Sequence, residues 1–204
     1  MELTERYPAL KGQEEKINSA IRLIVECCKK SGKLLLCGNG GSAADCSHIA
    51  GEFLKDFHIK RPISKEFADK LALCGVDESV ACALQEGIAA IDLTSQTAAL
   101  TAIGNDISFE MAYAQLTYAL ARDGDVLIAI STSGNSINVV RAAEIAKAMG
   151  LTVIAFTGER DSRLSDISTV TLRAPETDTY KVQEYHLPIY HYICLEVEKA
   201  LFAK

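Results

Sequence analysis

Apolar and polar positions follow two different periods along this chain. Short continuous apolar runs, such as Leu34-Leu35-Leu36-Cys37 and the VLIAI run at 126–130, indicate strands that are buried on both faces. Longer stretches carry apolar residues at helical spacing with Lys and Glu between them, as at Ile17, Ile21 and Ile24. The predicted strands are 34–37, 88–93, 126–130, 153–156 and 170–173, and the predicted helices are 10–30, 43–57, 94–102, 109–121, 137–149 and 180–202.

This order of elements predicts an α/β fold, namely a three-layer α-β-α sandwich with a mostly parallel central sheet and long N- and C-terminal helices. No linker or low-complexity tract interrupts it, so we expect one domain over 1–204. Arg61-Pro62 ends a helix. The segment 63–87 then predicts one or two short helices, for example 77–84, and forms an accessory segment in which we find no chemistry.

Charge and composition narrow the classes of function. Hydrophobic residues make up 49% of the 204 residues, so a substantial core is expected. The formal net charge of -6 argues against broad binding to nucleic acid or to an anionic membrane, because both need a basic face. No apolar run reaches the ~18 residues of a membrane span, and the polar, acidic start does not resemble a signal peptide. We expect a cytoplasmic protein with no nucleic-acid or membrane partner.

The seven cysteines are odd in number and form no CxxC pair. Most lie in apolar surroundings. These features favour buried free thiols in a reducing compartment over disulfides or a cysteine metal site.

Two loops rich in glycine and serine each follow a predicted strand and precede a predicted helix. They are Gly38-Asn39-Gly40-Gly41-Ser42 and Ser131-Thr132-Ser133-Gly134-Asn135-Ser136. Small residues let the backbone approach a ligand, and the hydroxyls can donate hydrogen bonds. Such loops lie at the carboxyl ends of strands, where open α/β sheets bind ligands. The spacing excludes a dinucleotide-binding fingerprint and a Walker loop. The repeated pattern predicts that the two loops bind a phosphorylated small molecule.

The candidate reactive groups lie on the helix after the first loop and on the last helix. His48 and Glu52 are four residues apart and share a helical face. Gln183 and His191 are eight residues apart, within ~80° around the helix axis. The spacing does not decide between His186 and His191. A carboxylate and a histidine suit proton transfer beside a carbonyl, and a divalent metal held by His and Glu would polarise that carbonyl.

Several stretches together resemble the bacterial phosphoheptose isomerases, which have the sugar isomerase (SIS) fold. The first runs from Leu36 to Asp45 and continues through His48-Ile49-Ala50-Gly51-Glu52-Phe53. The later ones, in the same order as in the family, are Gly104-Asn105-Asp106, Gly124-Asp125-Val126-Leu127, Ile130 to Ser136, and Gln183 to His191. The resemblance covers nearly the whole chain. It implies the interconversion of sedoheptulose 7-phosphate and D-glycero-D-manno-heptose 7-phosphate through an enediol, toward lipopolysaccharide or other surface glycans.

The family's residue roles carry over by position. The resemblance implies that Glu52 is the base and His191 the partner acid or base. It implies one zinc ion per subunit, held by His48, Glu52, Gln183 and His191. The remaining implied contacts are with the phosphorylated sugar and involve Asn39, Gly40, Gly41, Ser42, Glu52, Asn105, Asp106, Ser131, Thr132, Ser133, Ser136 and Gln183, with the Asp178-Thr179 loop nearby. It also implies a homotetramer with sites at subunit interfaces, which agrees with the apolar helices at both chain ends.

The chain departs from the family at three places. Lys55-Asp56-Phe57 replaces a Gly-Arg-Tyr stretch, Lys181 replaces an arginine, and 63–86 is longer than in compact members. Two alternatives remain open, the first because of these departures and the second because the same fold also serves in non-catalytic proteins. One is an isomerase of another ketose phosphate. The other is a non-catalytic SIS binding protein, of the kind that associates with a replication initiator or senses a sugar phosphate.

Overall fold

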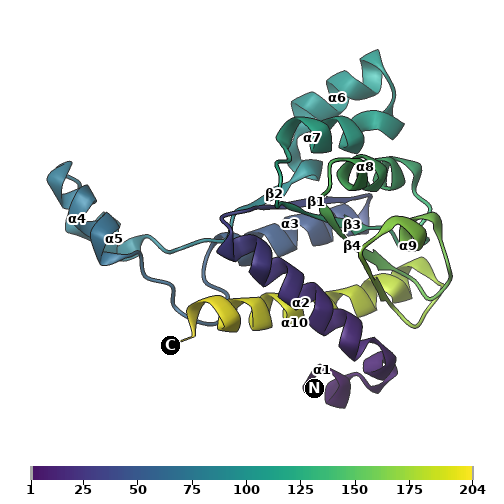
Figure 1. The fold of residues 1–204 in the computed structure, drawn as a ribbon, viewed down its shortest axis with the longest axis horizontal. Helices are drawn as coiled ribbons and strands as arrows, with labels where there is room; N and C mark the ends of the chain where they lie inside the picture. Colours follow the sequence, from purple (N-terminus) through teal and green to yellow (C-terminus); the bar gives the residue numbers. More distant parts are fainter. Residues whose placement is uncertain (1, 204) are drawn as a thin grey trace.

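The computed structural model describes residues 2–203 and has the predicted three-layer architecture (Figure 1). Its central sheet has the strand order β2-β1-β3-β4-β5, and each neighbouring pair is parallel. The strands are β1 Leu34–Gly38, β2 Ala90–Asp92, β3 Val126–Ile130, β4 Thr152–Thr157 and β5 Val170–Arg173. The α/β fold class is confirmed, and the described sheet is wholly rather than mostly parallel.

Helices cover both faces of the sheet. Their bounds are α1 Glu2–Arg6, α2 Glu14–Lys29, α3 Gly41–Leu54, α4 Lys65–Leu73, α5 Glu78–Ala83, α6 Thr97–Asp106, α7 Ala112–Leu120, α8 Ile137–Ala148, α9 Arg163–Ile167 and α10 Thr179–Phe202. Short 3-10 turns lie at Pro8–Gln13, Leu93–Ser95 and Phe109–Met111. Helices α2, α3 and α10 pack on one face and α6, α7 and α8 on the other (Figure 1). None of the helices in residues 2–203 has both the length and the apolar character needed to cross a bilayer.

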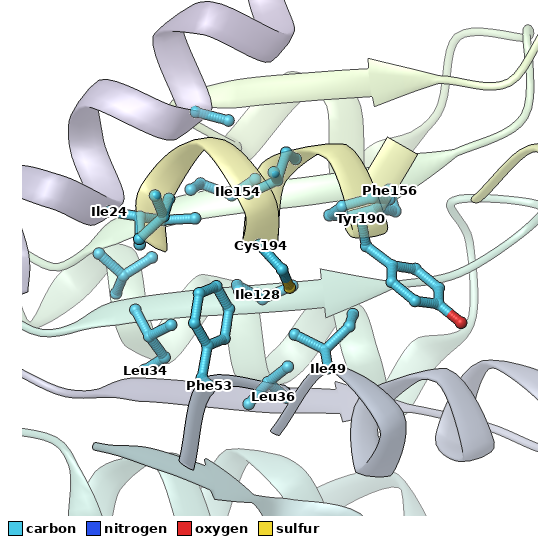
Figure 2. Packing of buried hydrophobic residues seen from close by; sticks show 14 of the residues in the cluster. Ile24, Leu34, Leu36, Ile49, Phe53, Ile128, Ile154, Phe156, Tyr190 and Cys194 are labelled. Atoms are coloured by element: carbon cyan, nitrogen blue, oxygen red, sulfur yellow. The ribbon is translucent and has the colours of Figure 1, made fainter. Parts of the chain in front are cut away.

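The strands sort their side chains between two cores because successive residues point to opposite faces. Leu34 and Leu36 join the core under α2, α3 and α10, whereas Leu35 and Cys37 join the core under α7 and α8. Figure 2 shows the first core, where Phe53 of α3 packs beside the strand residues and α10. This apolar layer holds α3 and α10 against each other, and these are the helices that carry the candidate reactive groups.

Three helices differ from the sequence-based expectation, and one of them is α1, since the sequence analysis predicts no helix over 2–6. Helix α6 ends at Asp106, so Gly104, Asn105 and Asp106 lie inside it and do not follow a helix that ends at 102. Gly104 does not stop it because a single glycine lowers helix stability by only about 1 kcal/mol. Helix α9 was not predicted. It has five residues, and a capping box between Ser162 and Ser165 fixes its start.

The accessory segment forms an arm of two short helices, α4 and α5, that projects from the rest of the chain (Figure 1). Neither helix buries a residue. An isolated antiparallel bridge between Pro62 and Gln85 closes the base of the arm. The arm also carries Cys74 and Cys82, which are exposed, so the expectation of buried thiols is wrong at these two positions; all seven cysteines are unpaired.

Candidate active site

The first loop leads directly from β1 into α3. Gly40 has a φ of 56°, a left-handed conformation that favours glycine. Ser42 is buried in the first turn of α3. Gln183 of α10 packs against Gly41, because a Cβ added there would lie 2.5 Å from the Gln183 Nε2 atom. The structure therefore brings the predicted Gln183 to the first loop.

The second loop is braced by its own hydroxyls. The Ser131 Oγ atom donates to the Ser136 Oγ atom at 3.0 Å, and the Gly134 N–H donates to the Ser131 carbonyl at 2.9 Å. Gly134 has a φ of 65°, and a Cβ there would lie 2.0 Å from the Ser162 Oγ atom. Only glycine fits this position. Thr132 and Ser133 face a cavity of about 180 Å³.

A pair of asparagines joins the two loops. Asn39, in the first loop, and Asn138, in the first turn of α8, exchange side-chain amide hydrogen bonds of 2.8 and 2.9 Å. Asn138 is buried and also accepts the Val139 N–H at 3.0 Å. Because parallel strands β1 and β3 are neighbours, their carboxyl ends place these residues side by side. The sequence analysis missed Asn138, although it follows the second serine-rich loop by two residues.

The predicted reactive groups meet where α3 and α10 cross. The His48 Nε2 atom lies 3.1 Å from the Glu52 Oε1 atom and 3.4 Å from the His191 Nε2 atom. The His48 and His191 rings pack edge to face with centroids 4.9 Å apart. One chain thus brings together three of the side chains that the sequence placed on one pocket. Beside His191 a cavity of about 320 Å³ opens between α1 and α10.

Two further residues support this cluster. The Tyr190 hydroxyl lies 3.0 Å from the His48 Nδ1 atom and 3.3 Å from the Asp45 Oδ1 atom. Burial raises the pKa of the Tyr190 phenol and that of the Asp45 carboxyl. The phenol therefore keeps its single proton near neutral pH. Neither residue was singled out from the sequence, although Asp45 lies one turn before His48 and Tyr190 precedes His191.

The structure decides between the two histidines of the last helix. His186 is fully buried, and its Nε2 atom lies 3.2 Å from the Thr157 carbonyl oxygen, to which it donates. Burial lowers its pKa to about 4. His191 instead contacts His48. Burial lowers the pKa of His191, and the charge of the neighbouring His48 lowers it further. His191 is thus the histidine that α10 presents to Glu52.

Some predicted sugar contacts lie elsewhere in the chain. Asn105 and Asp106 are exposed at the end of α6, on the opposite face of the sheet from α3 and α10 (Figure 1). Their side chains bond to each other, with the Asn105 amide donating to Asp106 at 2.8 Å. Asp178 is also exposed, and it pairs with Lys181 at 2.9 Å. One chain does not bring Asn105 and Asp106 to the His48 cluster.

The donor atoms of the cluster suit zinc in type and in pairwise spacing. Two imidazole nitrogens and a carboxylate oxygen are ligands that zinc prefers, and ligands of tetrahedral zinc at about 2.0–2.1 Å lie roughly 3.4 Å from one another. The separations from the His48 Nε2 atom are close to this value. Within residues 2–203, however, no group of three or more His, Cys, Asp or Glu side chains is placed so that it could hold a metal ion. The side chains face each other here, and they would have to turn toward a common ion.

Comparisons with known proteins identify the family to which the chain belongs. The SIS domain family model matches residues 2–91 and 76–158. A phosphoheptose isomerase of Burkholderia pseudomallei is 38% identical over 204 residues, covering 98% of this chain and 91% of the relative. The solved phosphoheptose isomerase structures from Neisseria gonorrhoeae and Francisella tularensis have TM-scores of 0.77 and 0.79 and identities of 34% and 28%; each match covers 95% of this chain and 91% of the other. The chain belongs to the phosphoheptose isomerases, a family of sugar-phosphate isomerases built on the SIS domain.

Proposed function

We propose that this protein interconverts sedoheptulose 7-phosphate and D-glycero-D-manno-heptose 7-phosphate through an enediol. The observation that carries this proposal is the contact of Glu52 and His191 with His48, on two helices whose other ends lie at the first loop. A carboxylate and an imidazole in one place are the groups needed for proton transfer between neighbouring carbons and oxygens. The names of the relatives support a phosphorylated heptose as the substrate. The choice of these two heptose phosphates follows the resemblance of the sequence to the family.

The two loops would hold the phosphate. The hydroxyls of Ser42, Thr132, Ser133 and Ser136 can donate hydrogen bonds to its oxygens, with Asn39, Gly40 and Gly41 alongside. The Ser131 hydroxyl, which donates to Ser136, would orient the Ser136 hydroxyl toward the phosphate. The N-termini of α3 and α8 add free backbone N–H groups and a favourable dipole. The pairing of Asn39 with Asn138 keeps the loops at a fixed separation, which supports binding of one group between them.

The chemistry would follow at the other end of the sugar. Glu52 would take the proton from the carbon next to the carbonyl and return it to the neighbouring carbon. His191 would move a proton between the two oxygens, a role that suits a histidine whose pKa lies below its usual value and which is therefore neutral near pH 7. His48, which is held by the Tyr190 hydroxyl, would keep Glu52 and His191 at a fixed separation.

We also propose that His48, Glu52, Gln183 and His191 hold one zinc ion in each subunit. The imidazoles of His48 and His191 and the carboxylate of Glu52 are donor types that fit this ion, and the Gln183 amide is included on the resemblance to the family. When bound, zinc would polarise the carbonyl and stabilise the enediolate.

A homotetramer would complete the site. The large apolar side chains Phe67, Leu73, Val80 and Leu84 are exposed on and beside the arm, and Asn105 and Asp106 lie away from the cluster in one chain. Both facts support assembly with further copies. We place the enzyme in the cytoplasm, where it would supply heptose for lipopolysaccharide or another surface glycan.

The proposal is tested by incubating the pure protein with sedoheptulose 7-phosphate and measuring the aldose phosphate formed, before and after dialysis against a chelator and with zinc restored. We expect turnover that falls on chelation and recovers with zinc. A parallel panel of five- and six-carbon ketose phosphates tests whether the departures from the family at Lys55, Lys181 and 63–86 change the preferred substrate. No turnover of the heptose with or without zinc contradicts the proposal, and faster turnover of another ketose phosphate reassigns the substrate.

A further inference from the structure

A buried ion pair lies directly behind the reacting groups. The Arg61 side chain and the Glu198 side chain are both fully buried, and an Arg61 Nη2 nitrogen lies 2.7 Å from the Glu198 Oε1 atom. Glu198 is on α10, seven residues after His191. Two helical turns separate them, so they share one face of the helix. The pair therefore lies on the side of α10 that packs against α3.

Arg61 fixes the end of α3 that carries Glu52. Its guanidinium donates to the Phe53 carbonyl at 3.0 Å and reaches the Glu52 carbonyl at 3.5 Å. These carbonyls belong to the last turn of α3, where backbone acceptors lack partners within the helix. The Phe202 ring packs 4.7 Å from the guanidinium and closes its other side. The main chain at Glu52 is thus held by a group outside its own helix.

Glu198 fixes the loop that follows α3. Its carboxylate accepts the backbone N–H groups of Phe57 and His58 at 2.8 Å and of Ile59 at 2.9 Å, in addition to the Arg61 Nε atom at 2.7 Å. The Phe57 ring then lies 5.8 Å from the His191 ring. One carboxylate therefore sets the position of the ring that contacts His191.

We infer that Arg61 and Glu198 are positioning residues that align Glu52 with His191 for the proton transfers. This inference rests on the proposed function, because it takes those two residues as the reacting groups. Apolar packing between α3 and α10 is not directional, whereas the pair ties the backbone of Glu52, the ring of Phe57 and the helix of His191 to one point. Buried ion pairs are weak evidence for stability, since apolar replacements are often equally stable. Alignment is the role that directional bonds can supply and apolar packing cannot.

The test uses Glu198→Gln and the double variant Arg61→Met/Glu198→Met, which replaces the pair by apolar side chains. We expect kcat to fall about 100-fold, as for a displacement of roughly 1 Å at a reacting group, with little change in KM because the phosphate loops are untouched. The His191 ring proton resonances should also move in the NMR spectrum, because the ring current of Phe57 changes. This second readout needs no activity, so it tells a failure of the pair to position His191 apart from a failure of the proposed function.

Asp125→Asn is the matched control. Asp125 is also buried and accepts backbone N–H groups, from Lys33 at 2.9 Å and Arg122 at 2.7 Å, but it lies at the other end of β1 and β3. A comparable loss of Tm with kcat near the wild-type value is expected. Should Glu198→Gln fail to fold, Arg61→Lys decides, because it keeps Glu198 and its bonds to the backbone N–H groups of the loop but loses the forked contacts of the guanidinium with α3. A folded pair variant with kcat within twofold of wild type and unmoved His191 resonances overturns the inference, as does an equal kcat loss in Asp125→Asn.

Discussion

The two halves of the candidate site are built from different kinds of groups. In the phosphate half the polar groups are small and uncharged, and they bond to one another, as Asn39 does with Asn138 and Ser131 with Ser136. In the reacting half the groups are titratable, and the contacts of His48 with Glu52 and His191 join two helices. The first half is organised by loops at neighbouring strand ends, and the second by the crossing of α3 and α10.

This difference separates binding from chemistry. A loop that is braced by neutral hydrogen bonds keeps its shape across a wide range of pH. A cluster of histidines and a carboxylate changes its charge with pH and depends on tertiary packing that lies far apart in sequence. Changes in the phosphate half should therefore act on KM, whereas changes in the reacting half should act on kcat.

The largest expected effect comes from Glu52→Gln. The amide keeps the shape of the side chain but cannot accept the proton from carbon, so kcat should fall by about 10²- to 10⁴-fold, with KM nearly unchanged. Steady-state rates of aldose formation measure this, with Tm as the check on folding. Glu144→Gln, at an exposed carboxylate of α8, is the control and should behave as wild type. A wild-type kcat in Glu52→Gln would show that another group is the base.

Most of the phosphate half could be predicted from the sequence because its signals are local. Each glycine- and serine-rich loop follows an apolar run of four or five residues, and such runs become strands wherever both faces are covered. The brace between the loops could not be predicted in this way. Asn138 is one polar residue inside the α8 pattern, and only the pairing of β1 with β3 places it beside Asn39.

The reacting half shows the limit of helical spacing. The spacing placed His48 with Glu52, but it left His186 and His191 equivalent. The two histidines differ in burial. His186 is fully buried and donates to the Thr157 carbonyl, whereas His191 faces α3 and contacts His48. The crossing of α3 and α10, which no local pattern encodes, makes this difference. The same crossing places the Tyr190 hydroxyl beside His48. From the sequence alone, Tyr190 would be taken for an ordinary aromatic residue of the core.

A smaller effect is expected from Asn39→Ala, which breaks the brace in the phosphate half. It leaves the buried Asn138 amide without its partner, at a cost of about 1–3 kcal/mol in the free energy of unfolding. KM should rise roughly tenfold, equivalent to about 1.4 kcal/mol, while kcat at saturation stays within a few fold. Urea unfolding and substrate titration measure the two quantities.

The double variant Asn39→Ala/Asn138→Ala supplies the control for this brace. Removing both amides leaves neither amide without its partner, and only the Val139 N–H loses an acceptor. The loss of stability should therefore be smaller than the sum of the two single losses. Additive losses would show that the two side chains do not act as a pair. A lower kcat with unchanged KM in Asn39→Ala would contradict the separation of binding from chemistry.

The smallest expected effect near neutral pH concerns the protonation of the buried His186 of α10, because this effect appears only in acid. Burial lowers the pKa of His186 to about 4, compared with about 6.5 in an unfolded chain. As the pH falls from about 6.5 toward 4, the unfolded chain takes up this proton and the native protein does not. His186 should therefore reduce the free energy of unfolding by at most about 1.4 kcal/mol per pH unit in that window, and by nothing above it.

Urea unfolding of wild type and His186→Phe from pH 7.5 to 4.5 isolates this contribution, because other groups titrate in both proteins. The difference in stability between the two should be constant above pH 6.5 and should shift in favour of the variant below it. Parallel curves throughout would mean that His186 is protonated in the native state.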